Sequence, residues 1–268
     1  MDYSKRSLQS LYKEVGVSYI GATTQSAKMN YSYNNGWETY CIYLAPSTMS
    51  GYQVCPNDKW CKQFCLNGSG RNKGDILVRG FEHSKINQSR IKKTKLFFEN
   101  RELFMELVVR EIIRAKNHAE KNRMNFAVRI NGTSDLNIES FIYKGKNLLQ
   151  MFPNIQFYDY TKCNGYLTIP KRYDNYDVTL SFNGFNWTKC KEYLDNGGKV
   201  AVVFMGELPK FYRGYKVINA NDYDMRFLDH KGTIMGLHYH KTANDYNGVN
   251  NNQYSKFIVM QDDINLQY

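Results

Sequence analysis

From residue 126 onward, short apolar segments with strand character alternate with segments of helical periodicity. The apolar segments are residues 126–130, 155–160, 178–181, 200–204, 216–218 and 233–237. Helical patterns between them cover residues 138–151 and 187–196, and a shorter one lies near Arg172. Alternation of this kind predicts a mostly parallel sheet whose strands are joined by right-handed crossovers.

An earlier strand, residues 39–44, precedes this pattern, and residues 91–121 have the apolar periodicity of a helix. The whole pattern predicts an α/β protein with a full or partial (β/α) barrel and a mostly parallel sheet, and an open doubly wound sheet is the alternative. No linker rich in Pro and Gly divides the 268 residues. We therefore expect one domain over 1–268, with an N-terminal extension of about 1–36 and a Cys-rich loop of about 45–80.

The loop after the first strand contains three of the six cysteines, Cys55, Cys61 and Cys65, with the spacing C-x5-C-x3-C. Three thiolates brought together repel one another unless a cation or a cluster neutralises them. A structural zinc site needs four ligands, usually from C-x2-C pairs, and this loop has no such pair. The spacing therefore favours an iron–sulfur cluster of the [4Fe–4S] type, and the alternatives are zinc and three ordinary buried cysteines. Cys41 is the predicted fourth ligand, ahead of His83.

The position of the cysteine loop resembles that in radical S-adenosylmethionine enzymes, in which three cysteines after the first strand of a barrel hold a [4Fe–4S] cluster. The usual spacing in those enzymes is C-x3-C-x2-C, and this chain departs from it. The resemblance implies S-adenosylmethionine as a further cofactor. It also implies an active site at the carboxyl ends of the strands.

Small and polar side chains follow three successive predicted strands, where the active sites of α/β proteins are found. Together they predict a pocket for a substrate or cofactor, although Asp135 could instead cap the next helix. The predicted pocket residues are Asn131, Ser134, Asp135, Tyr158, Tyr160, Lys162, Ser181 and Asn183.

Two shorter patterns contain residues that could bind an ion or exchange protons. Gly68, Gly70 and Arg71 lie in a glycine-rich basic segment that could bind an anion through backbone amides, or form a flexible turn. His238 and His240 lie two residues apart after the last of the six strands. They could bind a metal or exchange protons, or simply end a solvated strand.

Several segments resemble one bacteriophage family, the gene product 88-like family. They are Leu44-Ala45-Pro46, the cysteine loop, 129–135, 157–162, Arg226-Phe227-Leu228-Asp229 and Gly236-Leu237. The resemblance spans roughly residues 40–240. It implies a phage-encoded protein with the same cysteine cluster, located in the cytoplasm of the host cell, and it implies no particular reaction.

The chain has 36 basic and 25 acidic residues, a net charge of +11, which favours binding to polyanions such as nucleic acids or simply keeps the surface soluble. It has no apolar run long enough to cross a bilayer and no apolar segment near the N-terminus, so we expect a cytoplasmic protein without a membrane partner. The expected function is a phage-type iron–sulfur protein related to radical S-adenosylmethionine enzymes. The alternative is a non-enzymatic nucleic-acid-binding phage protein with a structural cluster or zinc.

Overall fold

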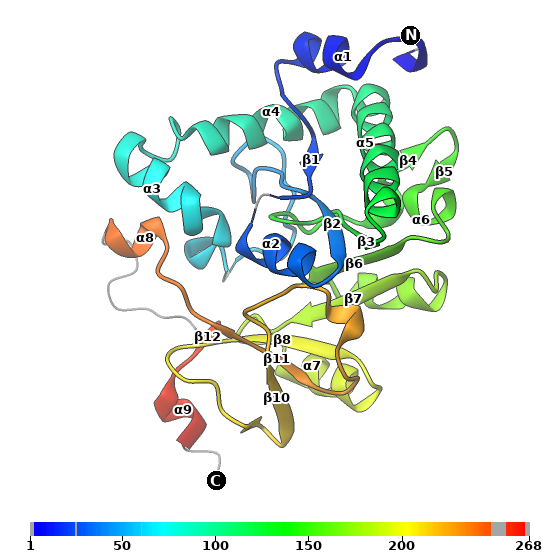
Figure 1. Ribbon diagram of the computed structural model, residues 1–268. Helices are drawn as coiled ribbons and strands as arrows, with labels where there is room; N and C mark the ends of the chain where they lie inside the picture. Colours follow the sequence, from blue (N-terminus) through cyan, green and yellow to red (C-terminus); the bar gives the residue numbers. More distant parts are fainter. Residues whose placement is uncertain (1–2, 25, 60, 248–255, 266–268) are drawn as a thin grey trace.

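A ten-stranded, mostly parallel sheet forms the centre of the protein (Figure 1). The computed structural model describes residues 3–24, 26–59, 61–247 and 256–265. The strand order is β1-β2-β3-β6-β7-β8-β11-β10-β9, with β12 beside β8. The parallel strands are β2 (Trp37–Ile42), β3 (Asn125–Arg129), β6 (Gln156–Thr161), β7 (Tyr176–Ser181), β8 (Lys199–Phe204), β11 (Ile234–His238), β10 (Tyr215–Asn219) and β12 (Ile258–Val259). Two antiparallel strands, β1 (Gly21–Ala22) and β9 (Phe211–Tyr212), end the sheet.

The α/β class and the mostly parallel sheet are confirmed, and each predicted strand has its counterpart in the sheet. The barrel is not confirmed. Over the described residues the strands form an open path from β1 to β9, and no pairing joins these two ends. Among the same residues, no helix is both long and apolar enough to cross a membrane.

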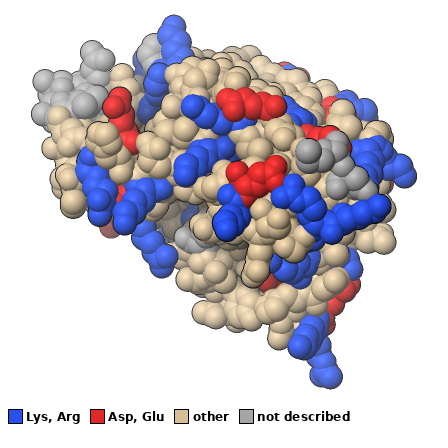
Figure 2. Space-filling view, turned by 90° about the horizontal axis from the view of Figure 1, so that it is seen from above, with Lys and Arg blue, Asp and Glu red and all other residues tan. Residues whose placement is uncertain are grey.

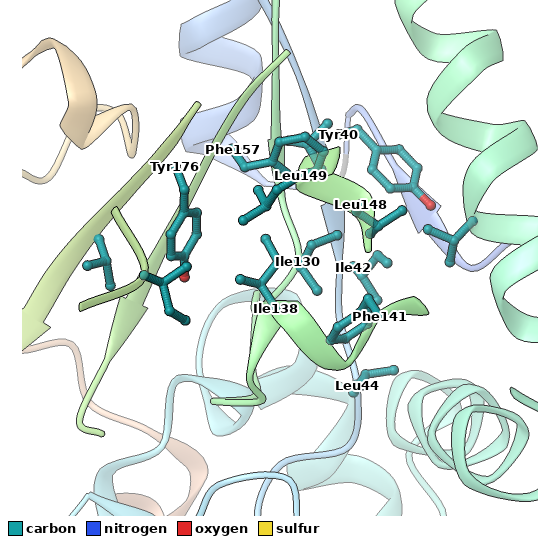
Figure 3. Close-up of a cluster of buried hydrophobic side chains, with 14 of the residues drawn as sticks. Tyr40, Ile42, Leu44, Ile130, Ile138, Phe141, Leu148, Leu149, Phe157 and Tyr176 are labelled. Atoms are coloured by element: carbon teal, nitrogen blue, oxygen red, sulfur yellow. The ribbon is translucent and has the colours of Figure 1, made fainter. Parts of the chain in front are cut away.

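One face of the sheet carries the main apolar core. Tyr40 and Ile42 of β2, Val128 of β3 and Phe157 of β6 point to this face, as the alternation of side chains along a strand requires. The helices that contribute to the core include α1 (Leu8–Val15), α4 (Lys85–Glu99), α5 (Arg101–Lys121), α6 (Leu148–Met151) and α7 (Trp187–Asp195). Figure 3 shows strand residues of this cluster facing Leu148 and Leu149 of α6.

The opposite face of the sheet is rich in polar and charged side chains. It carries Cys41 of β2, Arg129 of β3 and Lys199 of β8. Helix α2 (Ala27–Asn34) and the short helix η6 (Arg226–Leu228) lie against it. The Lys199 ammonium, for example, donates to the backbone oxygen of Arg226 at 2.6 Å.

Three of the helices predicted from sequence are present in the structure, two of them in a different form from the one expected. The periodic region 91–121 forms two helices, because Asn100 ends α4 and its side chain caps α5 by accepting from Leu103 N–H at 3.1 Å. Residues 187–196 form α7 as predicted. The pattern near Arg172 is the 3-10 helix η5 (Asn164–Lys171).

The predicted helix over residues 138–151 is largely wrong. This region contains the short helix η4 (Ile138–Ser140), a hairpin of β4 (Ile142–Tyr143) and β5 (Lys146–Asn147), and only then α6. The turn between the two strands is Lys144-Gly145, and both residues have positive φ, 47° and 81°. Such a turn matches the twist of paired strands and interrupts a helix.

The N-terminal residues and the Cys-rich segment hold more regular structure than expected. The predicted extension contains the 3-10 helix η1 (Tyr3–Lys5), α1, β1 and α2, and Leu11 and Ile20 are fully buried in the core. The predicted loop contains the 3-10 helices η2 (Lys62–Phe64) and η3 (Leu66–Gly68) and helix α3 (Gly70–Arg79). Near the C-terminus lie α8 (Ala243–Tyr246) and α9 (Gln261–Asn265).

Candidate functional site

The cysteine loop lies against the segment that follows β3, at the carboxyl edge of the sheet. Cys55 Sγ accepts from Ser47 N–H at 3.4 Å and lies 3.8 Å from the backbone oxygen of Thr133. Asp135 N–H donates to the backbone oxygen of Val54 at 2.8 Å. These contacts hold Cys55 at the end of the sheet where parallel α/β proteins place their active sites.

Cys61 and Cys65 belong to the turns that follow Cys55. Cys61 Sγ lies 3.8 Å from the backbone oxygen of Asp58, and Cys65 Sγ accepts from Asn67 N–H at 3.5 Å at the start of η3. All three cysteines are partly exposed and none forms a disulfide.

The three thiols lie within electrostatic range of one another. Burial raises the pKa of Cys55 to about 12, and Cys65 and Cys61 add to this effect. The pKa of Cys65 is raised by burial and by Cys61. The two thiols are therefore protonated near neutral pH, and binding a metal would release their protons.

The three thiols have the chemistry that an iron–sulfur cluster needs, but their positions in the structure are not close enough together to hold one. Thiolates are the ligands of such clusters. Over the residues that the structure describes, no group of three or more His, Cys, Asp or Glu side chains is close enough to hold a metal ion. Two buried polar atoms of the same segment, Ser47 Oγ and Asp58 Oδ2, have no hydrogen-bond partner in that part of the chain. A cluster would therefore have to draw the loop together.

Asp135 and Lys162 lie beside the cysteine loop, and as residues of a ligand pocket they stay a prediction. Asp135 accepts from Thr161 Oγ1 at 2.7 Å and from Lys162 N–H at 2.8 Å, and Cys163 Sγ lies 3.6 Å from it. Burial raises the pKa of Asp135, and these donors lower it only in part. Asp135 therefore joins the ends of β3 and β6.

Asn131 and Ser134 shape the turn after β3. Asn131 donates its backbone N–H to Asp159 Oδ1 at 2.8 Å and its Nδ2 to the backbone oxygen of Leu136 at 3.0 Å. Ser134 Oγ donates to Asn131 Oδ1 at 2.8 Å. Their polar groups are used within the protein, and as ligand contacts these two residues stay a prediction.

Asp159 gives a testable pH dependence. Burial raises its pKa to about 7, while hydrogen bonds from Asn131 and the charge of Arg129 oppose the shift. An unfolded Asp titrates near 4, so the stabilisation from protonated Asp159 is fully present below about pH 4 and is lost as pH rises through about 7. The stability advantage of the wild type over Asp159→Asn should therefore shrink by on the order of 1.4 kcal/mol per pKa unit over this range.

Urea unfolding of both proteins at pH 4 and pH 8 measures this difference, because the other titrating groups are common to both and largely cancel. An advantage that stays constant or grows with pH would contradict the assignment.

Tyr158 and Tyr160 belong to a second polar cluster, on the charged face of the sheet. Tyr160 OH donates to Asp224 Oδ1 at 3.3 Å, and the Arg129 guanidinium lies 4.8 Å from the Tyr160 ring centroid. Asp224 also pairs with Arg129 at 2.8 Å and with Lys28 at 2.9 Å. A cavity of about 10 Å³ beside these groups has room for about one water molecule.

Cys41, the predicted fourth ligand, lines this small cavity together with Arg129 and Asp224. Burial raises the pKa of Cys41 to about 12. Cys41 is thus on the sheet and not in the cysteine loop, although Arg90 lies near both Cys41 and Cys65. As a ligand, Cys41 stays a prediction. His83, the other choice, is exposed between α3 and α4.

Cys163 was missed from the sequence and lies nearer to the cysteine loop. Asn57, between Cys55 and Cys61, donates from Nδ2 to Cys163 Sγ and to the backbone oxygen of Lys162, each at 3.2 Å. The signal that could have found Cys163 is its position directly after the predicted strand end that carries Lys162.

Ser181 and Asn183 form the turn into α7. Asn183 Oδ1 accepts from the N–H groups of Phe185 at 2.9 Å and Asn186 at 3.0 Å. Asn186 Nδ2 donates to the backbone oxygen of Ser181 at 3.1 Å. Asn183 therefore has a local structural role, and ligand binding by this pair stays a prediction.

The glycine-rich segment is mainly helical. Gly68 is buried in η3 against Thr242, and Gly70, with φ of +56°, opens α3. Arg71 is exposed on the first turn of α3. Backbone N–H groups at a helix start attract anions, so anion binding at Gly68, Gly70 and Arg71 stays a prediction.

His238 bonds to the chain after β8, whereas Phe257 near the C-terminus packs against the cysteine loop. His238 Nδ1 is bonded to the backbone oxygen of Gly206 at 2.8 Å, and burial lowers the pKa of His240. Phe64 of η2 packs against Phe257 with ring centroids 6.1 Å apart. Phe257 itself therefore lies against the η2 part of the cysteine loop.

A protein-family model described as gene product 88 matches residues 14–255 of the chain. No curated protein and no solved structure matches the chain. The family description names no activity or ligand.

Proposed function

We propose that this chain, which belongs to the gene product 88 family, holds an iron–sulfur cluster through Cys55, Cys61 and Cys65. The observation that supports the proposal most is the grouping of three partly exposed thiols in one loop, each close enough to affect the charge of another. Two cations, Arg90 and Lys162, lie beside them. Positive charge at this place favours an anionic, thiolate-bound group.

A cluster fits this donor set better than zinc does. Structural zinc is almost always held by four protein ligands, and this loop offers three thiols. A [4Fe–4S] cluster held by three cysteines keeps one iron open to another ligand, so the protein needs to supply only three thiolate ligands. When bound, such a cluster would supply one-electron chemistry at the carboxyl edge of the sheet.

The likeness to radical S-adenosylmethionine enzymes rests on the position of the loop after β2, at the edge of parallel strands. A partial barrel and binding of S-adenosylmethionine belong to the same proposal. Reductive cleavage of S-adenosylmethionine by the reconstituted protein is the measurement that would extend cluster binding to enzyme activity.

The test of cluster binding is anaerobic reconstitution with iron and sulfide, followed by the visible spectrum and the bound iron. The wild type should gain broad visible absorbance, and a triple Cys→Ala variant at positions 55, 61 and 65 should lose nearly all of it. The matched control is Cys190→Ala, because Cys190 is fully buried in α7 and touches the core instead of the loop. Equal iron in the wild type and the triple variant would reject the proposal.

The alternative, nucleic-acid binding, rests on the net charge of +11. Figure 2 shows Lys and Arg side chains spread over the face seen from above, with Asp and Glu between them. A basic stripe that could follow a phosphate backbone is not evident on this face. The predicted location in the host cytoplasm likewise stays a prediction.

A further inference from the structure

A cavity of about 410 Å³ lies at the start of α5, among residues that the sequence did not single out. Its walls come from α5, from η1 and from the hairpin of β4 and β5. Strand β4 and η1 both contact α5, and Figure 1 shows the hairpin beside this helix. Pockets that hold small molecules in proteins have volumes of about 300 to 1,000 Å³. The cavity is therefore large enough for a small organic ligand.

Arg101 is a cation held in a fixed position at the wall of this cavity. Its Nε donates to the backbone oxygen of Phe97 at 2.6 Å, and one of its terminal nitrogens donates to the backbone oxygen of Ser140 at 3.0 Å. The guanidinium carbon also lies 3.4 Å from the centroid of the Phe97 ring, within the range of a cation–π interaction. These contacts hold the guanidinium in place without neutralising its charge.

Arg101 has no carboxylate partner among the residues that the structure describes. No Asp or Glu of that part of the chain lies within ion-pair distance of its guanidinium, although Glu102 and Glu106 line the same cavity. The Glu106 carboxylate instead accepts from Tyr143 OH and lies 3.7 Å from Arg110. A planar guanidinium that is partly buried and unpaired is well suited to bind a carboxylate, which can accept two of its N–H bonds.

The other walls of the cavity favour an apolar ligand body with a single negative charge. Ile142 is 52% exposed, and the side chains of Tyr3 and Tyr143 line the cavity beside it. Lys144 adds a second positive charge, whereas the exposed Glu102 adds a negative one. Because the charge of Glu102 repels a dianion more than a monoanion, the cavity suits a carboxylate better than a phosphate ester.

We propose that this cavity binds a small monocarboxylate with an apolar body. The carboxylate pairs with Arg101, and the apolar body lies against Ile142 and the two tyrosines. The inference goes beyond the proposed function and does not depend on it, because the cavity is lined by α5, η1 and the hairpin instead of the cysteine loop.

The test is a titration of the isotope-labelled full chain with 3-phenylpropanoate, followed by the chemical shifts of its backbone amides. We expect saturable shifts at residues 101–106 and 142–144. The neutral analogue 3-phenylpropanamide has the same apolar body and should bind about 10- to 100-fold more weakly, because it lacks the charge that pairs with Arg101. Phenyl phosphate, a dianion, should also bind more weakly than 3-phenylpropanoate.

Two variants test the two parts of the cavity. Arg101→Gln should weaken binding of 3-phenylpropanoate by about 10- to 100-fold. Ile142→Glu places a carboxylate at the apolar wall and should weaken it as well. Phe211→Glu is the matched control, because Phe211 is 51% exposed and lies, like Ile142, in a strand of two residues, but outside the cavity. This control should bind like the wild type.

The comparison of Ile142→Glu with Phe211→Glu decides the question if Arg101→Gln does not fold, since both are changes at exposed positions. The absence of saturable binding, or shifts confined to residues outside the cavity, would overturn the proposal. Equal affinity for the carboxylate and the amide would overturn the role of Arg101, and equal affinity for phenyl phosphate would overturn the choice of a monocarboxylate.

Discussion

Replacing Glu111 by alanine is expected to lower the free energy of unfolding by about 3 to 5 kcal/mol. Glu111 is fully buried in α5, and its carboxylate accepts four hydrogen bonds. The donors are Tyr12 OH, Ile20 N–H at 2.8 Å, Gly21 N–H at 2.8 Å and Tyr40 OH at 2.6 Å. Without the carboxylate these buried donors lose their acceptor, and the N-terminal segment loses three of its hydrogen bonds to α5.

Urea unfolding followed by circular dichroism measures this effect. Glu120→Ala is the matched control, since Glu120 lies on the same helix, is exposed and forms an ion pair with Lys116. An exposed pair contributes less than about 1 kcal/mol. Equal losses in the two variants would show that the Glu111 network does not hold the N-terminal segment.

Replacing Asp224 by alanine is the second large change, with an expected loss of about 2 to 4 kcal/mol. Asp224 pairs with Arg129 at 2.8 Å and with Lys28 at 2.9 Å on the charged face of the sheet. Arg129 is mostly buried, so the variant would leave its charge without a carboxylate partner. Because Asp224 is partly exposed, the loss should be smaller than for Glu111.

The loss in Asp224→Ala should depend on pH. Burial opposes ionisation of Asp224, but Lys28 and Arg129 outweigh it and hold the pKa well below its usual range. The stabilisation is therefore full above about pH 4 and is lost as pH falls toward the folded pKa. Asp222→Ala, at an exposed neighbouring position, is the control. A loss that grows in acid would contradict the ion pairing.

The strand positions could be predicted from sequence because each parallel strand is a short apolar run. In β8, for example, Val200, Val202 and Phe204 face the core, and Ala201 packs on the opposite face. The hairpin of β4 and β5 was missed because its strands are two residues long and its turn depends on positive φ at Lys144 and Gly145. Apolar periodicity does not show such local backbone geometry.

The surroundings of the cysteine loop could be predicted in part. Loop spacing singled out Cys55, Cys61 and Cys65, which stay predicted ligands. The rule for strand ends singled out Asp135 and Lys162, whose backbone groups bond to Val54 and Asn57 of the loop. The separation of Cys41 from the loop could not be predicted, because residues near the end of one strand can face either side of the sheet. Arg90 was missed for another reason: it lies on α4, and only tertiary packing brings it to Cys65.

The most direct test of cluster binding is the content of iron, acid-labile sulfide and zinc in the full chain purified without oxygen. The proposed function predicts iron and sulfide in equal amounts, both lost from the triple Cys→Ala variant, with no bound zinc. Zinc bound without sulfide, or a purified and folded chain that has neither iron nor sulfide after reconstitution, would contradict it.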